Sequence, residues 1–233
     1  MSETPQFGSE TALGTGTQNV SQIVGMATGL VTLNIVLMLV LSYTPVAGIG
    51  LLLFSNFFVG IAVFAVTVGG GFWIASEGTE QGSLPLAGAG VALTQVGYSL
   101  IGSAILLLAP SGSRVLAIGT AAVITGAITA GVVVVVFNTT RSFEGWQRYA
   151  GGLFIGGFAL GAVGVFVNQT LIAVAGLLFF LGFVVDLTYE VWAVRENRFA
   201  SDLRNAIGTY VAVMGVFIHV LQWVIRILSI LDN

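Results

Sequence analysis

The sequence predicts an all-α fold: a polytopic membrane protein whose seven transmembrane helices form one bundle. Three observations lead to this prediction. Only 7% of the 233 residues are charged, whereas about 25% is usual in soluble domains. Hydrophobic residues make up 56% of the chain, and the mean hydropathy is +1.01. Apolar runs of about 20 residues, the length that crosses a bilayer, recur along the whole chain.

The predicted spans divide residues 20–233, the transmembrane domain, into seven helices. Their approximate limits are 20–41, 46–75, 84–109, 115–137, 149–167, 171–190 and 206–231. The second span is longer than a bilayer requires, and we expect it to break at the glycine run 69–71, since glycine tolerates unwound backbone. Residues 1–19 are polar and lack a positive n-region, so they are predicted to be a disordered cytoplasmic tail and not a signal peptide.

The composition excludes several kinds of chemistry. The chain has no cysteine, so disulfides and thiolate sites are absent. It has no lysine either, which removes every Schiff-base mechanism, including a retinal-binding lysine. No phosphate, dinucleotide or metal motif occurs on a connector. We therefore expect no cofactor, no catalytic residue and no nucleic-acid partner.

The arginines of the connectors predict the orientation. Five lie in connectors on the side of the N-terminus and two on the opposite side. Positive charge is enriched on the cytoplasmic side of membrane proteins. The N-terminus is therefore predicted to be cytoplasmic and the C-terminus to be outside the cell membrane.

The sixth span carries the carboxylates that we expect to matter most. Asp186 lies about 15 residues into the span, and Glu190 follows four residues later on the same helix face. A charged side chain inside a membrane is costly, so its presence there indicates a function. We expect Asp186 to be a proton- or cation-sensing group. The alternative is a pair of interfacial carboxylates that reach water. Arg195, Arg198 and Arg204 in the next connector could supply charge beside Asp186.

The last span carries the only histidine, His219, with Gln222 and Arg226 on the same face at i+3 and i+7. A lone buried histidine is usually neutral and hydrogen-bonded, but a role in pH sensing is the alternative. Direct pairing with Asp186 is not expected. The antiparallel spans place Asp186 opposite position 211 or 212, and His219 is about 10 Å deeper.

Further polar and small residues lie inside the spans. Thr94, Gln95, Tyr98 and Ser99 crowd one side of the third helix, either as structural hydrogen-bonding groups or as the lining of a water-filled path. Asn34 and Asn56 are expected to hydrogen-bond within the bundle. The glycines of the fifth span are expected to allow tight helix packing, with a gating hinge as the alternative. They are Gly152, Gly156, Gly157, Gly161 and Gly164.

Three segments carry a family resemblance, which covers about half the chain from residue 120 onward. Residues 138–146 read Asn-Thr-Thr-Arg-Ser-Phe-Glu-Gly-Trp, similar to a threonine-rich turn, a basic residue and a tryptophan that opens a fifth helix. Residues 176–186 are similar to a sixth helix that ends in Tyr-Asp-Thr-Gln, and residues 207–217 with 226–228 to a last helix. In these segments the chain resembles the Bax-inhibitor family, also called the transmembrane Bax inhibitor motif family, as a divergent prokaryotic-type member.

The resemblance implies a bundle with the last helix at its centre and a calcium leak gated by two aspartates that share a proton. Gly208, Ala212 and Gly215, at i, i+4 and i+7, also favour close packing of the last helix. A one-residue shift makes Asp186 one of the two aspartates, but Ala212 stands where the family has the other. A lone carboxylate has no shared proton. We therefore expect any cation flux to lack a steep pH switch.

Three functional hypotheses follow. The leading one is a calcium or other cation leak channel or sensor, with Asp186 as its acidic gating group and the lipid bilayer as its surroundings. The alternative is a non-conducting regulatory or assembly protein of the same fold. A remote alternative is an intramembrane serine protease, because Ser99 and His219 are similar to the dyad of the rhomboid proteases. The last helix lacks the glycine spacing that such a dyad needs, so no enzymatic activity is expected.

Overall fold

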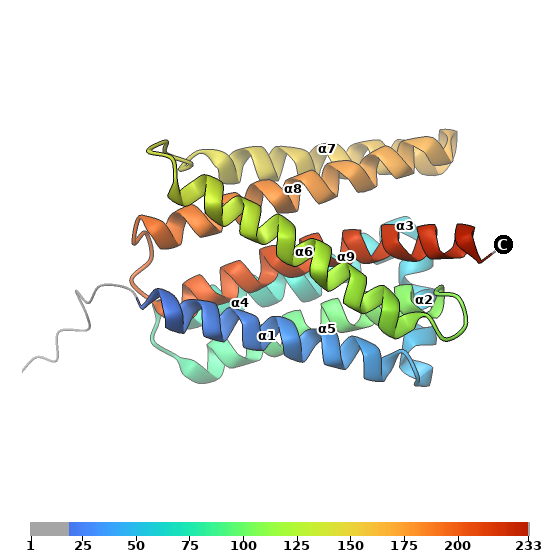
Figure 1. Cartoon of the computed structure of the whole chain (residues 1–233), viewed down its shortest axis with the longest axis horizontal. Helices are drawn as coiled ribbons and strands as arrows, with labels where there is room; N and C mark the ends of the chain where they lie inside the picture. The colour runs from blue at the N-terminus through green and yellow to red at the C-terminus, as the bar shows by residue number, and fades with distance from the viewer. Residues whose placement is uncertain (1–18, 233) are drawn as a thin grey trace, which may run out of the picture.

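The computed structural model of the chain describes residues 19–232, and over that range its regular elements are all helices (Figure 1). Among these described residues, seven helical spans are long and apolar enough to cross a membrane. They are α1 (Val20–Leu41), the composite span Phe57–Glu80, α5 (Leu84–Leu107), α6 (Arg114–Phe137), α7 (Trp146–Val167), α8 (Gln169–Arg195) and α9 (Asp202–Leu231). The predicted all-α fold with seven transmembrane helices is confirmed. The predicted tail falls outside the described residues, apart from Asn19.

The predicted second span, 46–75, is wrong in its limits. The chain first forms a short helix, α2 (Pro45–Ser55), and then starts the crossing span at Phe57. The break lies at Asn56, where φ is −95° and ψ is 122°. The side-chain oxygen of Asn56 accepts hydrogen bonds from the backbone N–H groups of Phe58 and Val59, at 3.0 and 3.1 Å. An asparagine that satisfies free N–H groups starts a new helix, whereas glycine only permits a break.

The crossing span is helical throughout, although it contains three segments. They are α3 (Phe57–Phe64), the π-helical segment η1 (Ala65–Gly69) and α4 (Gly70–Glu80). The glycine run therefore lies inside the helix. A Cβ at Gly71 would lie 2.8 Å from the backbone of α5, at Gly90 O and Thr94 N. The run allows α4 and α5 to pack with their backbones in contact, which is the common use of small residues between membrane helices.

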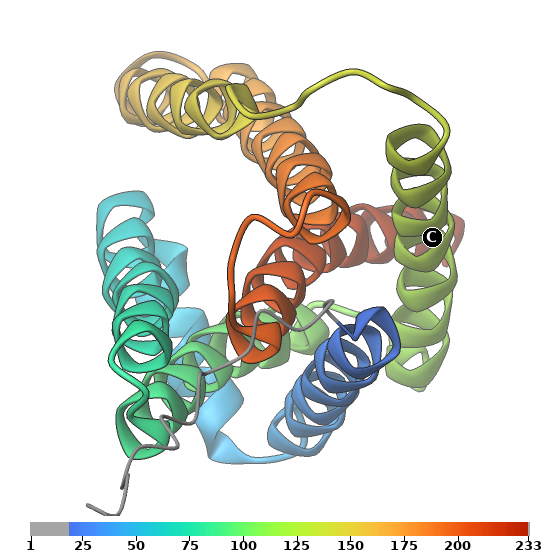
Figure 2. The same cartoon turned by 90° about the vertical axis from the view of Figure 1, so that its left-hand side faces the viewer.

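Helix α9 lies inside the bundle, as the sequence predicts. It packs against α1, α4, α5, α6 and α8, and Figure 2 shows it running between them. Nearly all of its residues from Arg204 to Leu221 are buried. Gly215 has no room for a side chain, because a Cβ there would overlap the ring of Phe183 from α8. The small residues of α9 therefore give the space that its neighbours fill.

Helix α7 lies at the edge of the bundle and packs mainly along α8 (Figure 2). Three of its glycines face close neighbours: Gly157 faces Ala175 of α8, Gly164 faces Ile172 of α8, and Gly161 faces the ring of Phe57 from α3. A Cβ at Gly152 would meet nothing within 4 Å. Tight packing against α8 and against Phe57 of α3 therefore explains these three glycines, and Gly152 lies outside both contacts.

The first and last described residues lie at opposite ends of the bundle (Figure 1), as an odd number of crossings requires. The end that holds the start of α1 also holds the α6–α7 and α8–α9 connectors, and with them five of the seven arginines. The chain is an integral multi-pass membrane protein by the length and hydropathy of its helices. The cytoplasmic location of the arginine-rich end stays a prediction.

Candidate functional site: an acidic cluster between α8 and α9

Two contacts set the register between α8 and α9. A Cβ at Gly208 would meet the carboxylate of Glu190, and a Cβ at Gly215 would meet the ring of Phe183. The two pairs belong to the same antiparallel register, because Phe183 and Glu190 are seven residues apart on α8, and Gly208 and Gly215 are seven residues apart on α9. Asp186 therefore lies opposite Ala212, as the sequence predicts, and α9 presents no second carboxylate there.

Glu190 forms a buried ion pair with Arg204. The Nη1 atom of Arg204 lies 3.1 Å from Oε2 of Glu190, and only 2% of Glu190 and 7% of Arg204 are exposed. The guanidinium carbon also lies 4.1 Å from the centre of the Phe199 ring and 4.9 Å from that of Phe72. Aromatic faces attract cations. Glu190 is therefore held inside the protein, and the alternative of a carboxylate that reaches water at the interface is wrong for this residue.

Arg204 lies in the first turn of α9 and not in a connector as predicted. The side chain of Ser201 caps α9 by accepting a hydrogen bond from the backbone N–H of Arg204, at 3.3 Å. The helix thus begins four residues before the predicted limit of 206. This extension turns the guanidinium toward α8, where it meets Glu190.

Asp186 is half-buried one helical turn from the ion pair. It has no hydrogen bond or ion pair within residues 19–232, although the charges of Glu190 and Arg204 both act on it. The cluster therefore contains two carboxylates and one guanidinium. One carboxylate of the cluster is therefore without a balancing cation among these three side chains, and unbalanced charge inside a membrane is costly.

The other two arginines predicted for this connector do not supply charge to Asp186, which corrects the prediction; Arg195 is the last residue of α8, and Arg198 alone lies in the connector. Arg195 donates hydrogen bonds to the backbone carbonyls of Val136, in the last turn of α6, and of Thr139 and Arg141, in the connector that follows. The distances to Thr139 and Arg141 are 2.6 and 3.0 Å. Arg198 forms a 2.8 Å ion pair with Glu144 at the surface. Both join connectors on the arginine-rich end of the bundle.

A buried hydrogen-bond network joins α1, α5 and α9. The Nδ2 atom of Asn34 donates to Ser99 Oγ at 2.7 Å and to the carbonyl of Gln95 at 3.1 Å. The hydroxyl of Tyr210 donates to Asn34 Oδ1 at 3.1 Å. The polar stripe of α5 therefore serves interhelical hydrogen bonding, the first of the two roles considered for it. No local pattern predicts that Tyr210 reaches Asn34, because the two residues are 176 positions apart in the chain.

Tyr98 brings this network to the acidic cluster. Its hydroxyl donates to the carbonyl of Val211 at 2.7 Å, and Val211 precedes the residue opposite Asp186. The Tyr98 and Tyr210 rings meet edge to face, with centroids 6.1 Å apart. A layer of polar groups thus crosses the bundle from α1 to α8 at the level of Asp186.

His219 lies apart from the cluster. Its Nδ1 atom is 2.8 Å from the carbonyl of Gly215 on the preceding turn, and its ring lies 5.7 Å from that of Phe183. Gln222 is half-buried and Arg226 exposed toward the C-terminal end. The structure therefore does not bring these three polar residues to Asp186.

Ser99 and His219 do not form a dyad. Ser99 Oγ accepts the Asn34 amide on the α1 side of α5, while His219 lies among the aromatic rings of α8. The pair that suggested a serine protease is thus separated by the packing of the bundle.

Within residues 19–232, no group of three or more His, Cys, Asp or Glu side chains is placed to hold a metal ion. Comparison with family profiles, curated proteins and solved structures finds no match for this chain. The resemblance to the Bax-inhibitor family therefore stays a prediction.

Proposed function

We propose that this chain is a Bax-inhibitor-like membrane protein that senses and passes cations, with Asp186 as its acidic gating group. The role is transport and not catalysis. In the orientation proposed from the arginines, Asp186 serves the cytoplasmic half of the cell membrane.

One observation carries this proposal: the charge of the cluster is unbalanced. Arg204 is engaged with Glu190 at 3.1 Å, and Asp186 has no ion-pair partner within residues 19–232. A half-buried carboxylate in this position is stabilised by a proton or by a passing cation. The neighbouring layer of hydroxyl and amide groups provides further polar atoms at the same depth.

The small number of ligands favours passage over tight binding. Ca²⁺ takes six to eight oxygen ligands in stable protein sites. The cluster offers the carboxylate of Asp186, while that of Glu190 is shared with Arg204. A cation at this site would keep most of its water, as a transported ion does.

A non-conducting role in regulation or assembly is the second candidate, and the packing beside Asp186 favours it. The ring of Phe183 fills the space at Gly215, one turn from Asp186, and Tyr98 and Tyr210 are fully buried. These side chains close the bundle at the level of the cluster. A flux measurement separates the two candidates.

The test is ion flux into phosphatidylcholine vesicles that contain the purified protein and either a calcium indicator or a pH indicator. Wild type should carry one of the two ions, and Asp186→Asn should reduce the flux at least about tenfold, since it removes the charge that attracts the cation. Glu80→Gln is the matched control, because Glu80 is an exposed carboxylate at the end of α4. It should behave as wild type.

Two results would contradict the proposal. Wild-type flux through Asp186→Asn would exclude this carboxylate as the gating group. The absence of both calcium and proton flux through wild type would leave the non-conducting protein as the better account.

A further inference from the structure

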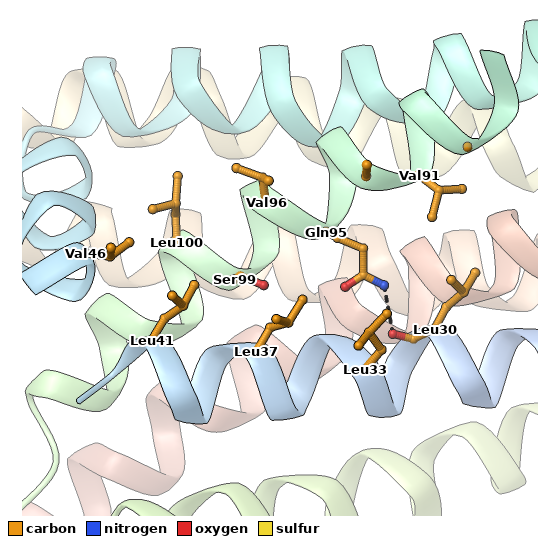
Figure 3. Close-up of a pocket in the computed structure, with 12 residues that line it drawn as sticks. Leu30, Leu33, Leu37, Leu41, Val46, Val91, Gln95, Val96, Ser99 and Leu100 are labelled. Carbon is orange, nitrogen blue, oxygen red and sulfur yellow. Dashed lines mark hydrogen bonds between the residues drawn. The ribbon is translucent and has the colours of Figure 1, made fainter. Parts of the chain in front are cut away.

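Two hollows in the described part of the chain, residues 19–232, differ in the chemistry of their linings. The hollow between α1 and α5 has a volume of about 560 Å³, and leucine and valine side chains surround it (Figure 3). Its lining is apolar, so it selects no polar ligand. The other, which we call the polar hollow, has a volume of about 470 Å³ and lies at the arginine-rich end. Its lining residues are Glu144, Gly145, Gln147, Arg148, Tyr189 and Arg198.

The polar hollow is open at the surface, because five of its six lining residues are exposed. It is formed by the start of α7, one residue of α8 and the connector between α8 and α9. Both helices are long and apolar enough to cross a membrane, so the start of α7 is expected at the level of the lipid headgroups. Tyr149 in the first turn of α7 is 67% exposed, and exposed tyrosines are typical of this level. A ligand can therefore enter from the headgroups or from water.

Tyr189 contributes a hydroxyl that has no partner. Only 6% of the residue is exposed, and its ring packs against that of Trp192 with centroids 5.8 Å apart. The hydroxyl forms no hydrogen bond within residues 19–232, and it is not one of the unpaired polar atoms that the bundle encloses. Polar groups of buried side chains nearly always have a partner. Since Tyr189 lines the polar hollow, its hydroxyl offers a donor to a ligand there.

The first turn of α7 adds a backbone donor. Gly145 is the N-cap of this helix and provides no side chain to cap it. Among the described residues, the N–H of Gln147 has no acceptor. The free N–H groups and the dipole at the start of a helix both favour an anion. Gly145 and Gln147 line the polar hollow, so an anion bound there would lie beside this helix start.

The charged side chains give the polar hollow an excess of one positive charge. The guanidinium of Arg148 forms no ion pair or hydrogen bond within residues 19–232. Arg198 lies 2.8 Å from the carboxylate of Glu144, and both side chains are about half exposed. Exposed ion pairs are weak, so an anionic ligand can compete with Glu144 for Arg198. Two guanidinium groups thus face a single carboxylate of the protein.

We infer that the polar hollow binds a phosphate group, held by Arg148 and Arg198, the start of α7 and the Tyr189 hydroxyl. Guanidinium groups bind phosphate through paired hydrogen bonds. A phosphate also has enough oxygens to accept from the helix start and the hydroxyl, whereas a carboxylate has only two. The phosphate can belong to an anionic lipid headgroup or to a soluble phosphate ester. This site is separate from Asp186, so its test needs no flux measurement.

The test uses two probes on the full chain in dodecyl maltoside micelles, a detergent without phosphate. One probe is phosphatidylglycerol with a pyrene on an acyl chain, followed by energy transfer from tryptophan. The other is radiolabelled glycerol phosphate, followed by equilibrium dialysis. Binding of the labelled lipid, with stronger competition by phosphatidylglycerol than by phosphatidylcholine, would identify a headgroup site. Binding of glycerol phosphate alone would identify a soluble ester. Equal competition by the two lipids, together with no binding of glycerol phosphate, would overturn the inference.

Variants separate a built site from general attraction by a basic surface. Arg148→Gln should weaken binding at least about fivefold. Arg141→Gln is the matched control, because Arg141 is exposed on the same connector outside the lining, and it should bind as wild type does. Tyr189→Phe keeps the charge and should weaken binding about 3- to 10-fold through the lost hydroxyl.

The opposite effect is expected for Glu144→Gln, which should tighten binding because it removes the carboxylate that competes for Arg198. Equal losses in Arg148→Gln and Arg141→Gln would mean that only general charge attracts the probe, and this result would overturn the inference. An unchanged affinity in Tyr189→Phe would do the same, since the buried hydroxyl would then play no part in binding.

Discussion

Arg204→Met is the substitution with the largest expected effect on stability. It removes the partner of a glutamate that is only 2% exposed, and it leaves two carboxylates close together with no cation between them. Removal of one partner of a buried ion pair costs roughly 3–5 kcal/mol. Met fills most of the volume and keeps the aromatic contacts with Phe199 and Phe72. The loss of unfolding free energy therefore measures mainly the removal of the positive charge.

The opposite substitution, Glu190→Gln, should cost less. Arg204 then keeps a carboxylate one turn away in Asp186, and the glutamine oxygen can still accept a hydrogen bond. We expect a loss of about 1–3 kcal/mol, in the range for a weakened hydrogen bond to a charged group. The double variant Glu190→Leu with Arg204→Met removes both charges and should recover most of the stability, as replaced buried ion pairs often do.

The measurement is reversible unfolding in mixed micelles with increasing dodecyl sulfate, followed by tryptophan fluorescence. Arg198→Met is the control, because Arg198 forms an exposed pair with Glu144, and such pairs contribute at most about 1 kcal/mol. Equal losses for Arg204→Met and Glu190→Gln would refute the role of Asp186 as a substitute partner. A loss below about 1 kcal/mol for Arg204→Met would refute the stabilising ion pair itself.

Three more predictions test the packing, the orientation and the missing carboxylate. Gly215→Leu should destabilise the protein by at least about 1–3 kcal/mol through overpacking, whereas Gly126→Leu should not, because Gly126 faces open space. Equal stability of the two variants would indicate that α9 lies at the edge of the bundle. Single cysteines at Ser142 and Asn168 should react differently with an impermeant thiol reagent on cells, with position 168 labelled from outside, and the reverse pattern would invert the proposed topology. Ala212→Asp should place a second carboxylate in the cluster, and flux through vesicles should then titrate between about pH 5 and 8; a flat profile would argue against a shared proton.

Much of the architecture could be predicted because it follows from the length of apolar runs. The bilayer imposes one length on every span, and six of the seven predicted spans agree with the structure to within a few residues. The second span could not be placed in this way, since glycine and asparagine both signal irregular backbone. The deciding factor is hydrogen bonding: Asn56 accepts from two N–H groups that hydrocarbon would leave unpaired.

The candidate site was predictable only in part. Asp186 and its place opposite Ala212 follow from helix geometry. The Glu190–Arg204 pair does not, because the predicted start of the last helix left Arg204 in a connector. The sequence Ser201-Asp202 was an available signal, since a serine followed by an acidic residue is typical of a helix start. The contacts of Asn34 with Tyr210 and Ser99 depend on which helices become neighbours, and local patterns carry no such information.

The π-helical segment Ala65–Gly69 lies within the second crossing span. It turns the part of the span that follows it about the helix axis, by the angle that one extra residue requires. Each residue of an α-helix turns the chain by about 100°, and a π turn accommodates one extra residue without ending the helix. Before the segment, Phe57 stacks on Phe158 of α7; after it, Gly71 lies against the backbone of α5. Deletion of Val66 would restore uniform winding and turn one of these two faces away from its neighbour by about a quarter of a circle. An insertion or deletion in this span is therefore expected to disturb helix contacts far more than the same change in a connector.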